Sequence, residues 1–210
     1  MDQLDSVVKI IALAMGAGWA SGINLYAAIL VLGLLGTTGH MILPPDLQIL
    51  MSPIVLAAAG CMYVAEFFAD KIPGVDTGWD TIHTFIRIPM GAMLAAGAVG
   101  DVTPAVALAA AIVGGGLAAG AHAAKSGTRV IINSSPEPFS NWMASLLEDI
   151  TVVTGIWLAL NYPWLFLGLL LIFILLLIWL LPKIWRGIRA LLVKLKQLFR
   201  RTAADSTGSG

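Results

Sequence analysis

The sequence is poor in charged residues and contains a single cysteine. Only 11% of its 210 residues are Asp, Glu, Lys or Arg, and 59% are hydrophobic, whereas ordinary soluble domains carry about 25% charged residues. This composition excludes a soluble globular domain. The lone Cys61 excludes an internal disulfide, and because it lies in an apolar run we expect it to be a small buried residue.

Signals for secretion and for common enzyme chemistry are also missing. The N-terminus carries Asp2 and Asp5 where a signal peptide has basic residues, so we expect no cleavable signal. No Ser/His/Asp grouping, metalloprotease helix or cysteine-based metal site is present. The formal net charge is zero, and we expect no nucleic-acid partner.

Apolar segments recur along the chain at lengths that approach or exceed the ~18–20 residues needed to cross a bilayer. We therefore expect an all-α, polytopic helical membrane protein with about six spans, occupying residues 1–181. The first segment is long for one span, and its Gly18, Gly22 and Asn24 indicate a break, although close helix packing would also explain the glycines. The predicted spans cover residues 7–35, 53–69, 79–99, 104–124, 142–160 and 164–181.

Two further patterns concern the hairpins and the tail. Pro53 and Pro104 each open a span in a similar local sequence, which indicates a repeated two-helix hairpin of one orientation. Residues 182–201 alternate apolar and basic residues at helical spacing, which predicts an amphipathic helix on an anionic membrane surface, or alternatively against a partner helix. We expect residues 202–210 to be a disordered tail. Lys71 and the basic tail fall on one side, so the positive-inside rule predicts that both termini are cytoplasmic.

Ionisable residues gather in two clusters beside these apolar spans. A charge at the centre of a spanning helix costs roughly 2.5–3.5 kcal/mol, so we interpret the clusters as a polar interior site. The alternative is an internal salt-bridge network that ties the helices together. The candidate binding residues are Asn24, Glu66, Asp70, Lys71, Asp76, Asp80, Arg87, His122, Lys125, Arg129, Glu148 and Asp149.

Such a constellation suits three kinds of ligand. Close carboxylates would relay protons, the basic members would hold a phosphate or carboxylate head group, and carboxylate oxygens would coordinate a divalent cation. His83 and His122 would titrate near neutral pH or form helix contacts. The candidate ligands of a divalent cation are Glu66, Asp70, Asp76, Asp80, Glu148 and Asp149.

The spaced acidic pattern and its basic partners resemble the domain of unknown function 4126 family of bacterial inner-membrane proteins. At Asn24 the chain departs from this pattern, because the resemblance leads us to expect a basic residue after Ser-Gly. The resemblance implies an inner-membrane location and adds no activity. It covers the chain to about residue 160 and rests on Ser21, Gly22, Glu66, Asp70, Lys71, Pro73, Asp76, Asp80, Thr84, Arg87, Pro89, Gly91, His122, Lys125, Arg129, Asn141, Ser145, Glu148 and Asp149.

Three functions remain open at the level of sequence. The first is a small secondary transporter or lipid-phosphate translocator, coupled to protons or cations, with membrane lipids, a small ion or a lipid head group as partners. The second is a metal-dependent membrane enzyme that acts on a lipid phosphate. The third is a non-catalytic membrane scaffold that recruits partners through its basic tail. A homodimer is compatible with all three.

Overall fold

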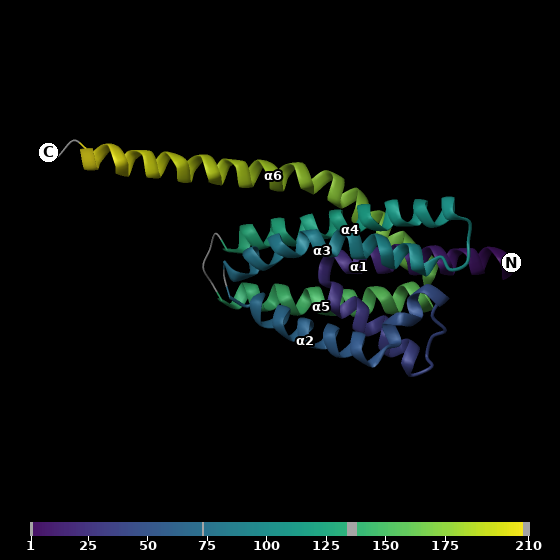
Figure 1. Cartoon of the computed structure of the whole chain (residues 1–210). Helices are drawn as coiled ribbons and strands as arrows, with labels where there is room; N and C mark the ends of the chain where they lie inside the picture. Colours follow the sequence, from purple (N-terminus) through teal and green to yellow (C-terminus); the bar gives the residue numbers. More distant parts are fainter. Residues whose placement is uncertain (1, 73, 134–137, 208–210) are drawn as a thin grey trace.

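The computed structural model describes residues 2–72, 74–133 and 138–207, and within these ranges every regular secondary-structure element is a helix. Six α-helices and one 3₁₀-helix form an elongated bundle (Figure 1). The all-α prediction is confirmed. The elements are α1 (Asp2–Thr37), η1 (Pro45–Met51), α2 (Pro53–Ala69), α3 (Val75–Ala98), α4 (Pro104–Asn133), α5 (Pro138–Asn161) and α6 (Pro163–Thr207).

The bundle has an apolar surface, and its largely apolar interior also contains charged side chains. Phe85 and Ile54 are 81% and 80% exposed, whereas Arg87 and Arg129 are completely buried. Cys61, which we expected to be buried, is exposed on this apolar surface. A surface of this kind is suited to lipid and not to water. The protein is therefore a helical membrane protein.

Fewer helices than expected have the length and hydropathy of a membrane span. Within the described residues, four qualify by length and composition: α1, α4, α5 and the first part of α6. η1 and α2, which meet at an angle of 66°, together make a fifth. The predicted span over 79–99 lies in α3, which does not qualify. Its Asp76, Asp80, His83 and Arg87 are all buried on one face of the helix, so its outer face can still meet lipid.

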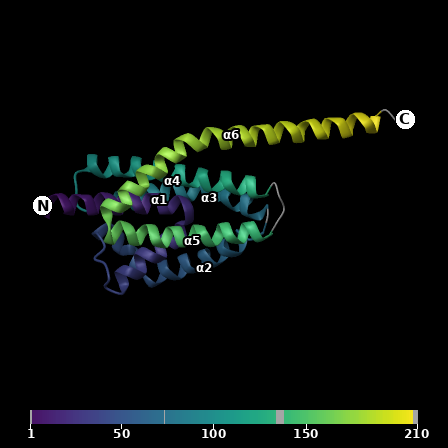
Figure 2. The same cartoon turned by 180° about the vertical axis from the view of Figure 1, so that it is seen from behind.

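α1 turns back on itself at Asn24. The backbone of Asn24 is extended (φ −145°, ψ 99°) within an otherwise helical segment. Before the break, Gly16 lies beside Ala159 near the end of α5, and after it Gly33 lies beside Leu56 near the start of α2. Both contacts are at the same end of the bundle (Figures 1 and 2). The predicted break is confirmed, but the segment enters the bundle, reverses inside it and returns, so it is not one full span.

The two ends of the chain lie at opposite ends of the bundle (Figures 1 and 2). The N-terminus lies at the end where α2 and α4 begin, and α6 leaves at the end where α2 is joined to α3, which we call the Lys71 end. This arrangement differs from the expectation that both termini lie on one side of the membrane. The reason is the reversal at Asn24: α1 returns to the end at which it enters, so the chain crosses the bundle one time fewer than the prediction assumes.

Close packing of small residues holds the first half of α1 against α4. A Cβ atom built on Gly18 would lie 2.7 Å from the Cα of Gly114, and one built on Gly22 would lie 2.8 Å from the Cβ of Ala121. Only glycine allows the two backbones to approach this closely. Helix packing therefore explains the two glycines, and Asn24 alone makes the break.

The two hairpins α2–α3 and α4–α5 have the same orientation, as predicted. α2 begins at Pro53 and α4 at Pro104, and both helices run toward the Lys71 end (Figure 1). In each pair the returning helix runs back toward the N-terminal end. The helices α2, α3, α4 and α5 therefore bring their charged segments to one level of the bundle.

α6 crosses the back of the bundle diagonally and continues well beyond it (Figure 2). It runs through Pro182 without ending, and Arg186 Nε donates a hydrogen bond to the Pro182 carbonyl at 3.2 Å. Its backbone is helical to Thr207, so the tail expected from residue 202 begins inside a helix. The side chains of residues 190–207 and all of residues 208–210 lie outside the described residues, as does most of the predicted amphipathic pattern.

Candidate functional site

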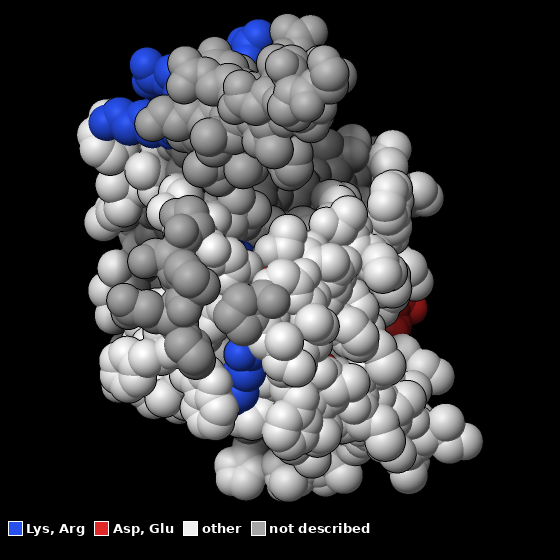
Figure 3. Space-filling model, turned by 90° about the vertical axis from the view of Figure 1, so that its left-hand side faces the viewer, with Lys and Arg blue, Asp and Glu red and all other residues white. Residues whose placement is uncertain are grey.

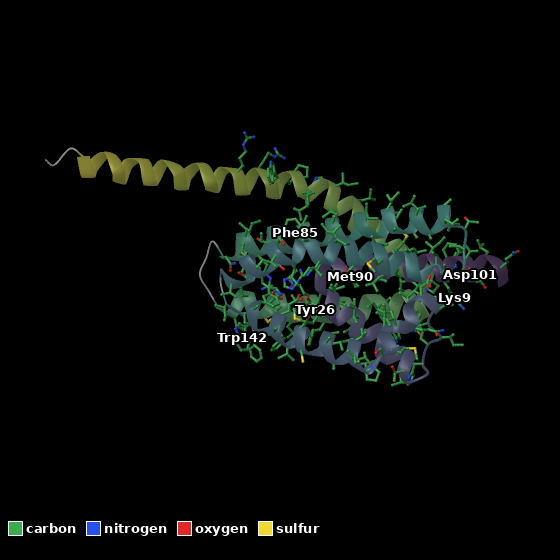
Figure 4. All side chains as sticks on the ribbon, viewed as in Figure 1. Lys9, Tyr26, Phe85, Met90, Asp101 and Trp142 are labelled. Carbon is green, nitrogen blue, oxygen red and sulfur yellow. The ribbon has the colours of Figure 1, made fainter. Side chains whose placement is uncertain are left out.

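Ionisable side chains from α2, α3, α4 and α5 meet in the interior of the bundle, where nitrogen and oxygen atoms gather beside Tyr26 (Figure 4). Arg87 donates to Glu66 Oε1 at 2.6 Å and to Asp80 Oδ1 at 2.9 Å. Arg129 donates to both Glu148 oxygens, at 2.7 and 3.1 Å. We call this cluster the buried network, and its members are Glu66, Asp70, Asp80, Arg87, Lys125, Arg129 and Glu148.

Lys125 is the centre of the buried network. Its Nζ lies 3.1 Å from Glu66 Oε1 and 3.1 Å from Asp70 Oδ2, 3.3 Å from Glu148 Oε2 and 3.7 Å from Asp80 Oδ1. It also donates to the carbonyl of residue 23 at 3.2 Å. An ammonium has three N–H donors. Lys125 therefore cannot satisfy all five oxygen atoms at the same time.

The network carries more negative than positive groups. Among the described residues it contains four carboxylates and three cations, so with every group ionised its net charge is −1. Glu66 Oε2, Asp70 Oδ1 and Arg87 Nε are buried and have no hydrogen-bond partner within the described residues. A buried polar atom without a partner is costly. The surplus charge and the unpartnered oxygens are therefore both unfavourable in this buried setting.

The break in α1 is built into this site. Asn24 Oδ1 accepts a hydrogen bond from the Ala27 N–H at 2.9 Å, which caps the second half of α1. Asn24 Nδ2 donates to Asp149 Oδ1 at 2.9 Å, and Tyr63 donates to the other Asp149 oxygen at 2.9 Å. The carbonyl of Ile23, which the break removes from the helix ladder, accepts from Lys125. Polar partners at the network therefore satisfy the interrupted backbone, as such a break inside a membrane requires.

The two histidines have different surroundings. His122 Nδ1 lies 3.2 Å from Arg87 Nη1, and its Nε2 lies 2.7 Å from Thr84 Oγ1, so it borders the network. Because a guanidinium only donates, Nδ1 is the accepting nitrogen and Nε2 carries the proton. His83 contacts the Tyr26 hydroxyl at 3.0 Å and stacks on an aromatic ring, which joins α3 to α1. Of the two, His122 alone touches the network.

Five predicted site residues are not members of the network: Asn24, Asp149 and His122 lie beside it, and Asp76 and Lys71 lie apart from it. Asp76 accepts from the Thr77 N–H at 2.6 Å and from Asn133 Nδ2 at 2.8 Å, so it fixes the start of α3 to the end of α4. Lys71 lies over the Phe67 ring, 2.9 Å from its centroid, and donates to the Phe67 carbonyl. Burial lowers the pKa of the Lys71 ammonium. Both residues hold the Lys71 end together and neither contacts the network.

The candidate metal ligands do not converge. Among the described residues, no three His, Cys, Asp or Glu side chains are placed to hold one metal ion. Arg87 and Lys125 lie between the network carboxylates, and Asp149 faces Tyr63 and Asn24 instead. The donor set therefore fits a divalent cation poorly.

Sequence reasoning did not include three residues that complete the site among its candidate binding residues, although Asn141 is one of those that carry the family resemblance. Tyr63 precedes Glu66 by three residues on α2 and binds Asp149. Asn141 accepts from Arg129 through its backbone and side-chain oxygens. Ser126, next to Lys125, donates to Asp80 Oδ2 at 3.4 Å. Helical spacing from the charged residues would have identified Tyr63, because residues three apart share one face of a helix.

No curated protein and no solved structure matches the chain in the comparisons. The sequence profile of one family, Domain of unknown function (DUF4126), matches residues 11–183. This stretch contains every member of the buried network, the break at Asn24 and the spans that surround them. The chain therefore belongs to the DUF4126 family.

Proposed function

We propose that the protein is a small secondary transporter in which the buried network takes up and releases a proton during the transport cycle. The observation that carries the proposal is the surplus of one carboxylate in the interior of an apolar bundle. An uncompensated buried charge is unfavourable, and a bound proton removes it. Intramembrane carboxylates that relay protons are typical of pumps and transporters.

The proton is assigned to the pair formed by Glu66 and Asp70. These residues lie one turn apart on α2, and each has one buried oxygen without a partner. Asp70 has the weaker ion pairs, at 3.1 Å to Lys125 and 3.5 Å to Arg129. The break in α1 supports a transport function as well, because discontinuous helices form the ion and substrate sites of many secondary transporters.

The same contacts favour this function over the alternatives. Arg87, Lys125 and Arg129 each contact at least two carboxylates, so a phosphate head group would have to displace an existing partner. The poor convergence of the carboxylates gives a metal-dependent enzyme less support. A scaffold needs no uncompensated charge in its interior, because apolar packing would stabilise it as well.

The orientation that we propose follows from the exposed basic residues. Lys183, Arg186 and Arg189 are exposed on α6, which runs toward the Lys71 end (Figure 3). Asp46 and Asp101 lie in or beside the loops at the opposite end. By the positive-inside rule the Lys71 end faces the cytoplasm, so that in an inner membrane the N-terminus faces outward.

The proposal is tested by infrared difference spectroscopy of the protein in nanodiscs as the pH is changed. Wild type should show the C=O band of a buried carboxylic acid that grows on acidification, and Asp70→Asn or Glu66→Gln should remove or shift it. Asp101→Asn, which changes a carboxylate in an exposed loop, is the matched control and should leave the band unchanged. A band absent from wild type would overturn the proton site.

The transport step is tested in proteoliposomes that contain a pH-sensitive dye. A transported solute should collapse an imposed pH gradient across wild-type vesicles and not across Asp70→Asn vesicles. Equal rates in the two preparations would contradict a role for the network in coupling. Asp70→Asn is expected to fold, because it brings the network to three carboxylates and three cations.

A further inference from the structure

A groove between α4 and α5 connects the apolar surface of the bundle to the buried network. Its volume is about 590 Å³, within the range of about 300–1,000 Å³ that is usual for small-molecule sites. Phe173 of α6 borders it, where α6 crosses the back of the bundle (Figure 2). Its other apolar walls are Ala121, Ala124, Met143, Ala144 and Leu147.

Two network members and the break in α1 lie along this groove. Lys125 and Glu148 line it, and so does Ile23, whose carbonyl binds Lys125. The Glu148 side chain is 17% exposed, whereas the other network side chains in the ion pairs are at most 3% exposed. Glu148 is therefore the network carboxylate that a molecule in the groove would meet.

The apolar walls of the groove and the charge of the network together indicate which class of molecule the groove binds. Apolar walls fit an apolar body, and a network with one surplus carboxylate attracts a positive group and repels a negative one. We infer that the groove binds a lipophilic organic cation, whose apolar body lies between α4 and α5 and whose charge lies beside Glu148. This inference rests on the proposed transport function and names its substrate class.

Competition for the same surplus charge would couple the cation to the proton. A cation beside Glu148 brings the network region to neutrality without a proton on Glu66 or Asp70. Binding of one therefore weakens binding of the other, which is the linkage that an exchange of protons for cations requires. Cation binding should release a proton from the protein.

The experiment compares two probes of nearly equal size and opposite charge, tetraphenylphosphonium and tetraphenylborate. Binding is measured by equilibrium dialysis against nanodiscs that contain the protein, and empty nanodiscs give the background from lipid. Wild type should show saturable binding of the phosphonium and none of the borate. Glu148→Gln should weaken phosphonium binding at least tenfold.

A groove-filling variant separates the groove from the charge. Ala144→Trp places an indole in the groove and should abolish saturable phosphonium binding. Val153→Trp is the matched control, because Val153 is exposed about two and a half turns from Ala144 along α5, on the opposite face of the helix. This variant should bind phosphonium as wild type does. Phosphonium binding that survives Ala144→Trp would overturn the groove as the site, and saturable borate binding that Ala144→Trp removes would overturn the charge argument.

Proton release in weakly buffered solution distinguishes the two proposals. Release on phosphonium binding, absent in Asp70→Asn, supports both the groove and the proton site. Saturable binding without proton release would leave the cation site in place and overturn proton coupling. A pH-dependent carboxylic acid band without phosphonium binding would overturn the groove and leave the proton site in place.

Discussion

Substitution of Arg87 should be among the most destabilising single changes in this chain, although it alters only a side chain. Its guanidinium contacts Glu66 and Asp80, and all three side chains are at most 1% exposed. Arg87→Met leaves four buried carboxylates with two cations. Removal of one partner from a buried ion pair costs about 3–5 kcal/mol, so we expect Arg87→Met to lower the free energy of unfolding by that amount.

The second variant tests whether charge is the cause. Arg87→Met/Asp80→Asn restores the wild-type surplus of one carboxylate, so it should recover a large part of the lost stability. Reversible unfolding in mixed micelles with increasing SDS measures Arg87→Met, Asp80→Asn and the double variant, and together they give the coupling energy between the two positions. Arg186→Met, on the exposed part of α6, is the control and should change stability little.

Two results would refute this reasoning. If Arg87→Met unfolds like wild type, the interior is hydrated enough to screen the network, and the surplus carboxylate loses its importance. If the double variant is as unstable as the sum of the two single variants, the stability of the network does not depend on its charge balance. In that case the ion pairs act independently.

Three further predictions concern packing, topology and the helix break. Gly22→Val should strongly reduce stability, because a Cβ at this position would meet the Ala118 carbonyl. Gly116 has open space around it, so Gly116→Ala should raise stability by up to about 1 kcal/mol. Unfolding in SDS measures both variants. Reporter fusions should place the two termini on opposite sides of the membrane, and a shared side would contradict the reversal of α1. Asn24→Ala should cost about 0.5–2 kcal/mol for the lost cap, and Asp149→Asn, which keeps an acceptor for Asn24, should cost less.

The sequence was sufficient to predict the network because of how few charges the chain has. Only 11% of the residues are charged, and a charged side chain inside an apolar helix is costly unless it faces a partner. Glu66 and Asp70 share one face of α2, and Arg87 shares one face of α3 with Asp80 and His83. For these residues the helical period and the cost of burial are enough to predict convergence.

The reversal at Asn24 could not be predicted in the same way. A break between Gly16 and Asn24 was expected from length and composition, but the direction of the second half depends on contacts distant in sequence. Asn24 reaches Asp149 on α5, and the freed Ile23 carbonyl reaches Lys125 on α4. Asp76 and Lys71 were predicted to belong to the site because their spacing matches that of the network residues. Their actual partners are groups at the ends of helices.

The buried network and the break in α1 act on each other through Lys125. The same ammonium serves four carboxylates and the carbonyl that the break exposes, with fewer donors than acceptors. Under the proposed function, neutralising one carboxylate, by a proton on Asp70 or a cation beside Glu148, would free donor capacity of Lys125 for the Ile23 carbonyl. Loss of the proton or the cation would draw Lys125 back toward the carboxylates. The charge bound at the network would then alter how firmly the reversed helix is held, which would supply the two structural states that the proposed transport cycle needs.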